Sequence, residues 1–410
     1  GADALSDLRR RADELRTVEE RIEFVDREMP LPVLMFVFDQ VPPVLAGLAA
    51  LAVAERLVAR WLGRPYGVEP VRRWLPHDPT AAMGLDLWRL ASRLAQRDEQ
   101  PSVAEPGVAE FLARYGHRAA DHEIDVGAPR FADDPTYVLG LLRTYIGTLA
   151  ERRDADDALR RFEEGVARAR RTSAESVAAT SRVKGPAHAA VLRVLLDRGR
   201  ALAGLREQPK FDLVRAVALA RHVLRQVGEA LAADGVLAAA EDIFFLDPAD
   251  VRTALREGTA SRLRERVADN RREFELARAR SAVPRILTSE GEAVYGPAAA
   301  PGSDTLVGTP VSPGVHEGVV RVVASPVNAG LQPGEVLVAA TTDPGWTPLF
   351  LTAGALVMEV GGVVSHGALV AREYGLPAVT AVVDATTLLE TGQRVRVDGA
   401  AGTVTVLSEA

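Results

Sequence analysis

Hydrophobic residues recur with a period near 3.6 over most of the first 284 residues, with Arg, Asp and Glu at the intervening positions. This spacing predicts amphipathic helices, separated by turn signals such as Asp78-Pro79 and Gly185-Pro186. The predicted helices are Leu5–Arg27, Val44–Leu62, Pro79–Arg97, Val108–Tyr115, Tyr137–Leu149, Ala155–Thr180, Ala187–Gly204, Asp212–Ala233, Pro248–Glu257 and Ala260–Ala279. We therefore expect a mainly helical domain over residues 1–284.

The pattern changes after residue 284. Pro284–Ser303 is rich in Ala, Gly and Pro and is typical of a linker, which we place at residues 285–305. Short valine-rich runs separated by Gly and Pro then predict strands. These strands are Val319–Ala324, Glu335–Ala339, Leu356–Glu359, Ala378–Val382, Arg394–Val397 and Thr403–Leu407. The expected architecture is multidomain, α plus α/β, with a small α/β domain over residues 306–410.

The composition is typical of a soluble globular protein, with 47% hydrophobic and 26% charged residues among 410. A net charge of −7 does not support a nucleic-acid partner. The absence of cysteine excludes disulfides, thiol nucleophiles and thiolate metal sites. Only two of the 49 basic residues are lysines, Lys184 and Lys210, so a lysine stands out in this arginine-rich chain.

The most apolar stretch is Leu31–Ala54, and its longest unbroken run begins at Val41. That run is too short to span a bilayer, and no signal peptide is visible, so we expect a buried helix, no membrane partner and a cytoplasmic location. Met35, Phe36 and Phe38 in this stretch either line a ligand cavity or form plain core.

The candidate chemistry lies in the run from Gly361 to Val379. Gly361 and Gly362 allow backbone conformations and close approaches that other residues disfavour. Ser365 suits an N-cap and Gly375 a left-handed C-cap, so a short helix would begin at His366. An imidazole at a helix N-terminus lies where free amides and the helix dipole favour an anion. The residues alone fit either a phosphoryl-carrying histidine or a histidine that merely caps a helix.

The whole run, from Gly-Gly through His366 to Ala-Arg-Glu and Gly-x-Pro-Ala-Val, resembles the phosphohistidine segment of the phosphoenolpyruvate-utilising enzymes. The resemblance implies a small swivelling β/β/α domain in which His366 carries a phosphoryl group and Gly361, Gly362, Ser365 and Arg372 support it. Asp343-Pro344-Gly345-Trp346-Thr347-Pro348-Leu349-Phe350 is similar to the loop that precedes this histidine. Asp343 and Thr347 would orient the imidazole, or Asp343 would cap a helix, while Trp346 and Phe350 would pack. Val364 and Gly367 stand where relatives often have threonine and alanine.

Three upstream segments are similar to the rifampin phosphotransferase branch of this family: Phe111–Arg118 with Glu123–Asp125, Arg206–Phe211, and Glu241–Leu246. Pro209 suits the first turn of the helix that follows, so Arg206 and Lys210 would flank a helix N-terminus. A paired Arg and Lys at this place would clamp the phosphoryl group in flight, and a solvated basic pair is the alternative. His117 would face the substrate or be a polar core residue.

Nothing in the chain resembles the ATP-grasp domain that charges the histidine in this family, and no metal site is indicated. We therefore expect ATP and Mg²⁺ to act through a missing ATP-grasp domain or subunit, and this chain to be inactive alone. The resemblance implies an ATP-dependent phosphotransferase of the dikinase type acting on a hydroxyl of a hydrophobic small molecule such as a rifamycin. The alternatives are a biosynthetic or pyruvate-like acceptor, or a non-catalytic ligand-binding protein that retains a relic histidine domain.

Overall fold

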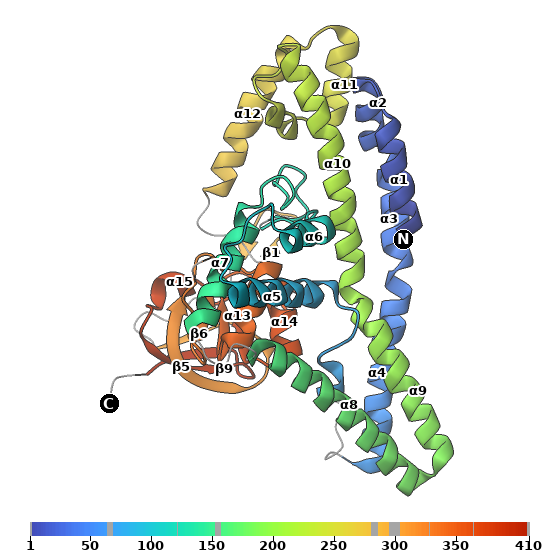
Figure 1. Ribbon diagram of the computed structural model, residues 1–410, viewed down its shortest axis with the longest axis vertical. Coiled ribbons are helices and arrows are strands. Elements are labelled where there is room, and N and C mark those ends of the chain that lie inside the picture. The colour runs from blue at the N-terminus through green and yellow to red at the C-terminus, as the bar shows by residue number, and fades with distance from the viewer. Residues whose placement is uncertain are drawn as a thin grey trace. The chain divides into compact units, whose positions relative to one another are not determined.

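A computed structural model describes residues 2–63, 69–120, 122–151, 157–279, 286–294, 304–327, 329–363 and 365–407 (Figure 1). The chain divides into two compact units. The first comprises Gly1–Pro42, Arg114–Asp134 and Gln208–Val283, and the second comprises Pro43–Ala113, Pro135–Glu207 and Pro284–Ala410. The predicted boundaries at residues 284 and 306 stay predictions.

The first unit is helical. Its elements are α1 (Ala2–Glu14), α2 (Val18–Glu23), the π-helical turn η1 (Phe24–Glu28), α3 (Pro30–Asp39), α10 (Gln208–Ala233), the 3₁₀ turn η5 (Ala240–Phe245), α11 (Pro248–Glu257) and α12 (Ser261–Arg278). The predicted helix Leu5–Arg27 is interrupted because Thr17 and Glu20 form a reciprocal capping box that starts a new helix. One core of the first unit packs Leu8, Phe24 and Phe36 against Val223 of α10.

The second unit contains the remaining helices and the sheet. Its helical elements before the sheet are α4 (Val41–Leu62), η3 (Glu69–Arg72), α5 (Pro79–Arg97), α6 (Pro106–Tyr115), α7 (Thr136–Glu151), α8 (Asp157–Lys184), α9 (Pro186–Ala203) and η4 (Gly204–Glu207). Asp78 caps α5 by accepting hydrogen bonds from the amides of Thr80 and Ala81. Apart from Leu5–Arg27, the predicted helices are thus confirmed as elements, with ends shifted by a few residues.

One sequence expectation about the apolar stretch is wrong. Among the described residues, Val18–Leu62 is one helical run that is long and apolar enough to cross a membrane by length and composition, and only 11% of its most apolar window is buried. Pro42 and Pro43 do not break it, because they occupy the first turn of α4, where the missing amide hydrogens have no helical partner. The stretch is therefore a largely exposed apolar helix and not the buried helix that we expected.

The C-terminal region is built on an eight-stranded mixed sheet of order β3-β10-β9-β5-β6-β7-β8-β4, in which β5, β6, β7 and β8 are parallel. The strands are β3 (Thr305–Val307), β4 (Thr309–Ser312), β5 (Val315–Val322), β6 (Val336–Ala339), β7 (Ala355–Met358), β8 (Ala378–Thr380), β9 (Arg394–Asp398) and β10 (Thr403–Val406). A separate hairpin pairs β1 (Ile286–Leu287) with β2 (Ala293–Val294) inside the predicted linker. Residues 295–303 of that linker lie outside the described residues.

Successive side chains of the central strands point to opposite faces of the sheet, and each face packs against its own core. Figure 1 shows the sheet with the helices that accompany it. Leu337 and Leu356 face a core completed by α13 (Thr347–Thr352) and α14 (His366–Tyr374). Val338 and Val357 face the opposite core, which includes Ala385 of α15 (Ala385–Leu388). Because both faces are covered, β6 and β7 are apolar throughout, as strands in parallel sheets usually are.

Candidate functional site

His366 lies at the first position of α14, directly after the loop that leaves β7. The loop turns at Gly361, whose φ of 146° disfavours any residue with a side chain. Ser365 occupies the N-cap position, and its hydroxyl donates a hydrogen bond to the Gly362 carbonyl at 2.9 Å instead of capping α14. Gly375 ends α14 with a φ of 66°, the left-handed cap that the sequence predicts.

The imidazole of His366 is half-buried, with Nε2 shielded from solvent. It lies at the carboxyl edge of the parallel strands, where the loops after β6 and β7 emerge side by side. Ligand-binding loops of α/β sheets typically occupy this edge, and the amino end of α14 adds free amides and a positive dipole. The position therefore suits a side chain that binds or carries an anion.

Gly367 departs from the alanine expected at this position for a packing reason. A β-carbon built on Gly367 would lie 2.5 Å from both Met358 Sδ and Thr342 Oγ1. Real β-carbons essentially never make such a contact, so an alanine would require the Met358 or Thr342 side chain, or the first turn of α14, to shift. Glycine lets this turn approach β7 closely.

Arg372 and Arg206 tie α14 to its surroundings. Arg372 donates to the carbonyls of Ala368 and Val363, so it braces the loop before His366. Burial, with a smaller contribution from the nearby Arg206 charge, lowers the pKa of Arg372. Arg206, in η4, forms an ion pair with buried Glu373 of α14 and lies 4.0 Å from Asp78. Arg206 is therefore engaged by carboxylates in this arrangement.

Asp343 organises the loop between β6 and α13. Its carboxylate accepts hydrogen bonds from the Gly345 amide at 2.6 Å, from Trp346 Nε1 at 2.8 Å and from the Tyr137 hydroxyl of α7 at 3.0 Å. The Tyr145 hydroxyl donates to the Gly345 carbonyl at 2.9 Å, and burial, aided by the Asp343 charge, raises the pKa of Tyr145. Asp343 thus shapes this loop and its contact with α7.

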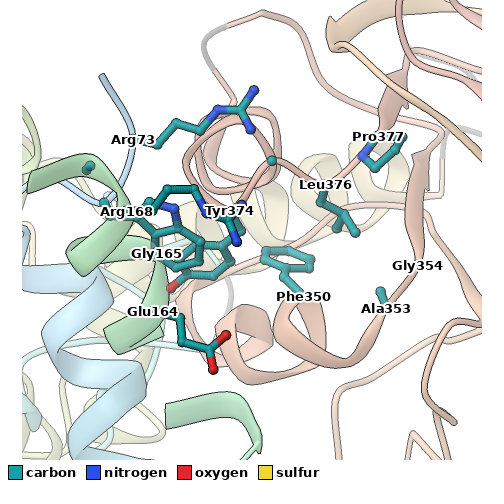
Figure 2. Close-up of a pocket in the computed structure, with 13 residues that line it drawn as sticks. Arg73, Glu164, Gly165, Arg168, Phe350, Ala353, Gly354, Tyr374, Leu376 and Pro377 are labelled. Carbon is teal, nitrogen blue, oxygen red and sulfur yellow. The ribbon is translucent and has the colours of Figure 1, made fainter. Parts of the chain in front are cut away.

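A cavity of about 380 Å³ opens beside the carboxyl end of α14. Figure 2 shows Arg168 and Glu164 of α8 on one side of it, and Phe350 and Tyr374 of the sheet region on the other. The Tyr374 ring stacks on Trp74, with ring centroids 4.8 Å apart and an interplanar angle of 19°. Arg200 donates to the Trp74 carbonyl at 2.9 Å and so fixes this segment.

Lys210 belongs to a different cluster, in the first unit. Its ammonium lies 3.2 Å from the carboxylate of buried Glu123, which also binds buried Arg118 in a two-point ion pair. The His117 ring packs edge-on against Phe211 at 4.6 Å. Burial, followed by the Arg118 charge, lowers the pKa of His117 to about 3, so this imidazole is neutral.

The predicted site residues fall in both units. The boundary between the two units falls between Arg206 and Lys210. Met35 and Phe38 are 54% and 60% exposed on α3, whereas Phe36 is buried in the core of the first unit. Trp346 and Phe350 are buried in the core beneath α13, as expected for packing residues. The side chain of Thr347 lies outside the described residues.

Sequence reasoning missed Glu373, Asp78, Glu123 and Tyr137 as partners of the candidate residues. Glu373 and Glu123 lie within the family-like segments, each near an arginine in sequence. A buried carboxylate requires a positively charged partner, so a glutamate near an arginine in such a segment is the signal that could have found them. Tyr137 and Asp78 carry no comparable signal, because their partners are distant in sequence. Within the described ranges, no group of three or more Asp, Glu or His side chains is arranged to hold a metal ion.

Comparison with known families matches two parts of this chain. Residues 39–207 match the rifampicin phosphotransferase fourth domain, and residues 331–402 match the mobile domain of PEP-utilising enzymes. Among solved structures, aconitase X of Thermococcus kodakaraensis gives a TM-score of 0.22 at 22% identity, covering 25% of this chain and 98% of that one.

Curated relatives align along most of the chain. Rifampicin phosphotransferase of Streptomyces sviceus is 33% identical over 389 residues, which cover 89% of this chain and 44% of that protein. The Bacillus cereus and Bacillus subtilis proteins of the same name are 29% and 31% identical over 91% and 87% of this chain, and 45% and 43% of their own lengths. The chain thus spans less than half the length of these relatives. The resemblance inferred from the residues is confirmed: residues 331–402 match the mobile domain of PEP-utilising enzymes, residues 39–207 match the rifampicin phosphotransferase fourth domain, and rifampicin phosphotransferases align along most of the chain.

Proposed function

We propose that this chain is the carrier and acceptor part of an ATP-dependent phosphotransferase of the dikinase type. His366 carries the phosphoryl group to a hydroxyl of a hydrophobic small molecule such as a rifamycin. The observation that supports it best is the position of His366, at the amino end of α14 behind a glycine turn, inside the matched mobile domain. In the transfer step the nitrogen–phosphorus bond breaks, an oxygen–phosphorus bond forms, and the released imidazole of His366 takes up the proton that the acceptor hydroxyl loses. We further propose a cytoplasmic location, where ATP is available.

The phosphoryl donor is assigned to a separate ATP-grasp domain or partner subunit. The described residues offer no carboxylate cluster for Mg²⁺, and the relatives are more than twice as long as the aligned region. Of the two proposed clamp residues, Lys210 is 41% exposed and accessible, while Arg206 is held by Glu373. Each is paired with a carboxylate, and Lys210 is the more exposed of the two and so the more accessible to the equatorial phosphoryl oxygens.

A hydrophobic acceptor is favoured over a pyruvate-like one by the exposed face of α3. Leu31, Leu34, Met35 and Phe38 are all more than half exposed, and their spacing places them on one side of the helix. Large exposed apolar faces of this kind mark interaction sites. A small anionic metabolite would gain little from such a surface.

The carrier role is tested with labelled ATP and the full-length enzyme, or this chain plus an ATP-grasp partner. Wild-type protein should acquire acid-labile, alkali-stable label, and His366→Ala should acquire none. His222→Ala, which removes an exposed histidine of α10, is the matched control and should label normally. Label that persists in His366→Ala removes this residue from the mechanism.

The acceptor surface is tested separately by rifampicin binding to Met35→Asp and Phe38→Asp. Losing one buried apolar side chain costs roughly 1.5–3 kcal/mol, so affinity should fall about tenfold or more. Leu276→Asp, at an exposed leucine of α12, is the control. Unchanged affinity in the α3 variants would contradict this acceptor surface and leave the carrier role intact.

A further inference from the structure

One face of α7 receives the loop that precedes α13. Tyr137, Leu141 and Tyr145 are four residues apart and so lie on the same side of the helix. The two tyrosines donate hydrogen bonds to Asp343 and to the Gly345 carbonyl. A β-carbon on Gly345 would lie 2.6 Å from the Tyr137 hydroxyl and 3.1 Å from Leu141 Cδ1, so only glycine lets the loop sit this close.

A second set of contacts holds the carboxyl end of α14. Trp74 stacks on Tyr374, and Arg206 pairs with the neighbouring Glu373. Trp74 is itself fixed by buried Arg200, so the stacking surface is preformed on the helical side. The two sets of contacts therefore hold the mobile domain at two places in the chain, one before and one after His366. The first is the loop that contains Asp343 and Gly345, and the second is the carboxyl end of α14.

We propose that Trp74, Tyr137, Leu141, Tyr145 and Arg206 form a docking seat that holds the mobile domain and positions His366. This inference rests on the proposed function, in which His366 must visit two places. Polar and aromatic contacts suit a reversible interface, because hydroxyl and guanidinium groups exchange protein partners for water when the domain leaves. Arg206 is accordingly a positioning residue that acts through Glu373.

Cysteine crosslinking tests the seat without any phosphoryl chemistry, because the natural chain has no cysteine. A β-carbon built on Gly140 of α7 would lie 3.6 Å from Val327 Cβ, which lies between β5 and β6 of the sheet region. Disulfides require a Cβ separation of about 3.5–4.5 Å. Full-length Gly140→Cys/Val327→Cys should form an intrachain disulfide under mild oxidation, and neither single variant should. Failure of the double variant to crosslink would overturn the seat.

The contribution of the named residues is measured as the crosslinking rate in the same background. Tyr137→Phe combined with Trp74→Leu removes one hydrogen bond and one ring stack, which should slow the reaction about tenfold. Trp61→Leu is the matched control, since Trp61 contacts His188 away from the seat. An unchanged rate in the seat variant would show that these residues do not hold the domain.

Locking the seat also separates this inference from the proposed function. The oxidised double-cysteine protein should not acquire label from ATP at His366, and a reductant should restore labelling. Labelling that is equally fast in the crosslinked protein would contradict a seat that His366 must leave. If the double-cysteine protein crosslinks normally under oxidation but acquires no label after reduction, the proposed function is refuted and the docking seat is supported.

Discussion

The neutral state of half-buried His117 predicts a measurable acid sensitivity of the first unit. Burial lowers the pKa of this imidazole from about 6.5 to about 3. The folded value is below the unfolded one, so the unfolded chain takes up the proton first as the pH falls. The stability contributed by the neutral ring is fully present above about pH 6.5 and is lost progressively as the pH falls toward about 3.

The size of the effect follows from the same shift. As the pH falls from about 7.5 to about 5, protonation of the unfolded His117 ring should lower the free energy of unfolding by about 2 kcal/mol. Only the part of this range below the unfolded pKa counts, which is about 1.5 units, and each unit is worth about 1.4 kcal/mol. His117→Gln should abolish this loss, while His222→Gln, at an exposed histidine of α10, should retain it.

The assay is urea unfolding at the two pH values, followed by far-ultraviolet circular dichroism. Tryptophan fluorescence would miss the transition, because all four tryptophans belong to the second unit. NMR titration of the His117 ring, assigned with the His117→Gln variant, checks the pKa directly. Equal losses of stability in wild type and His117→Gln would refute the argument from burial.

Two further predictions concern packing and buried charge. Gly367→Ala should destabilise the second unit by about 1–3 kcal/mol in thermal or urea unfolding, because Met358 Sδ and Thr342 Oγ1 fill the space. The control Gly362→Ala, at a position with open surroundings, should change the free energy of unfolding by less than about 0.5 kcal/mol. Equal effects of the two substitutions would contradict the packing argument. Glu123→Gln should lower the free energy of unfolding by about 3 kcal/mol or more, because buried Arg118 loses its counter-charge. Lys210→Met should lower it by about 1 kcal/mol or less, because Lys210 is 41% exposed. The reverse order in urea unfolding would show that Lys210 is the essential partner.

Local patterns predicted the helical region, the sheet region and the His366 segment because each depends on neighbours in sequence. The N-cap position of Ser365 and the left-handed Gly375 follow from backbone preferences within a few residues. The interruption at Thr17 was missed although its capping box is equally local, because the apolar spacing continues across it.

The exposure of α3 and α4 was beyond sequence patterning. A run of apolar residues reads the same whether its neighbours cover it or not, so composition favoured burial where the structure leaves Met35 and Phe38 exposed. Only the arrangement of the other helices of each unit decides which apolar side chains find a core.

The sequence by itself determined that His366 follows a glycine turn and begins a short helix, since the glycines before it and Gly375 at the end of the helix act locally. Only the tertiary structure decided which groups meet that helix. Arg206 binds Glu373 and Tyr137 binds Asp343 across more than 160 residues of chain, and Lys210 binds Glu123 within the first unit. Such pairings depend on how helices and sheet pack, because a charge or a hydroxyl carries no information about which distant partner will be brought within hydrogen-bonding distance.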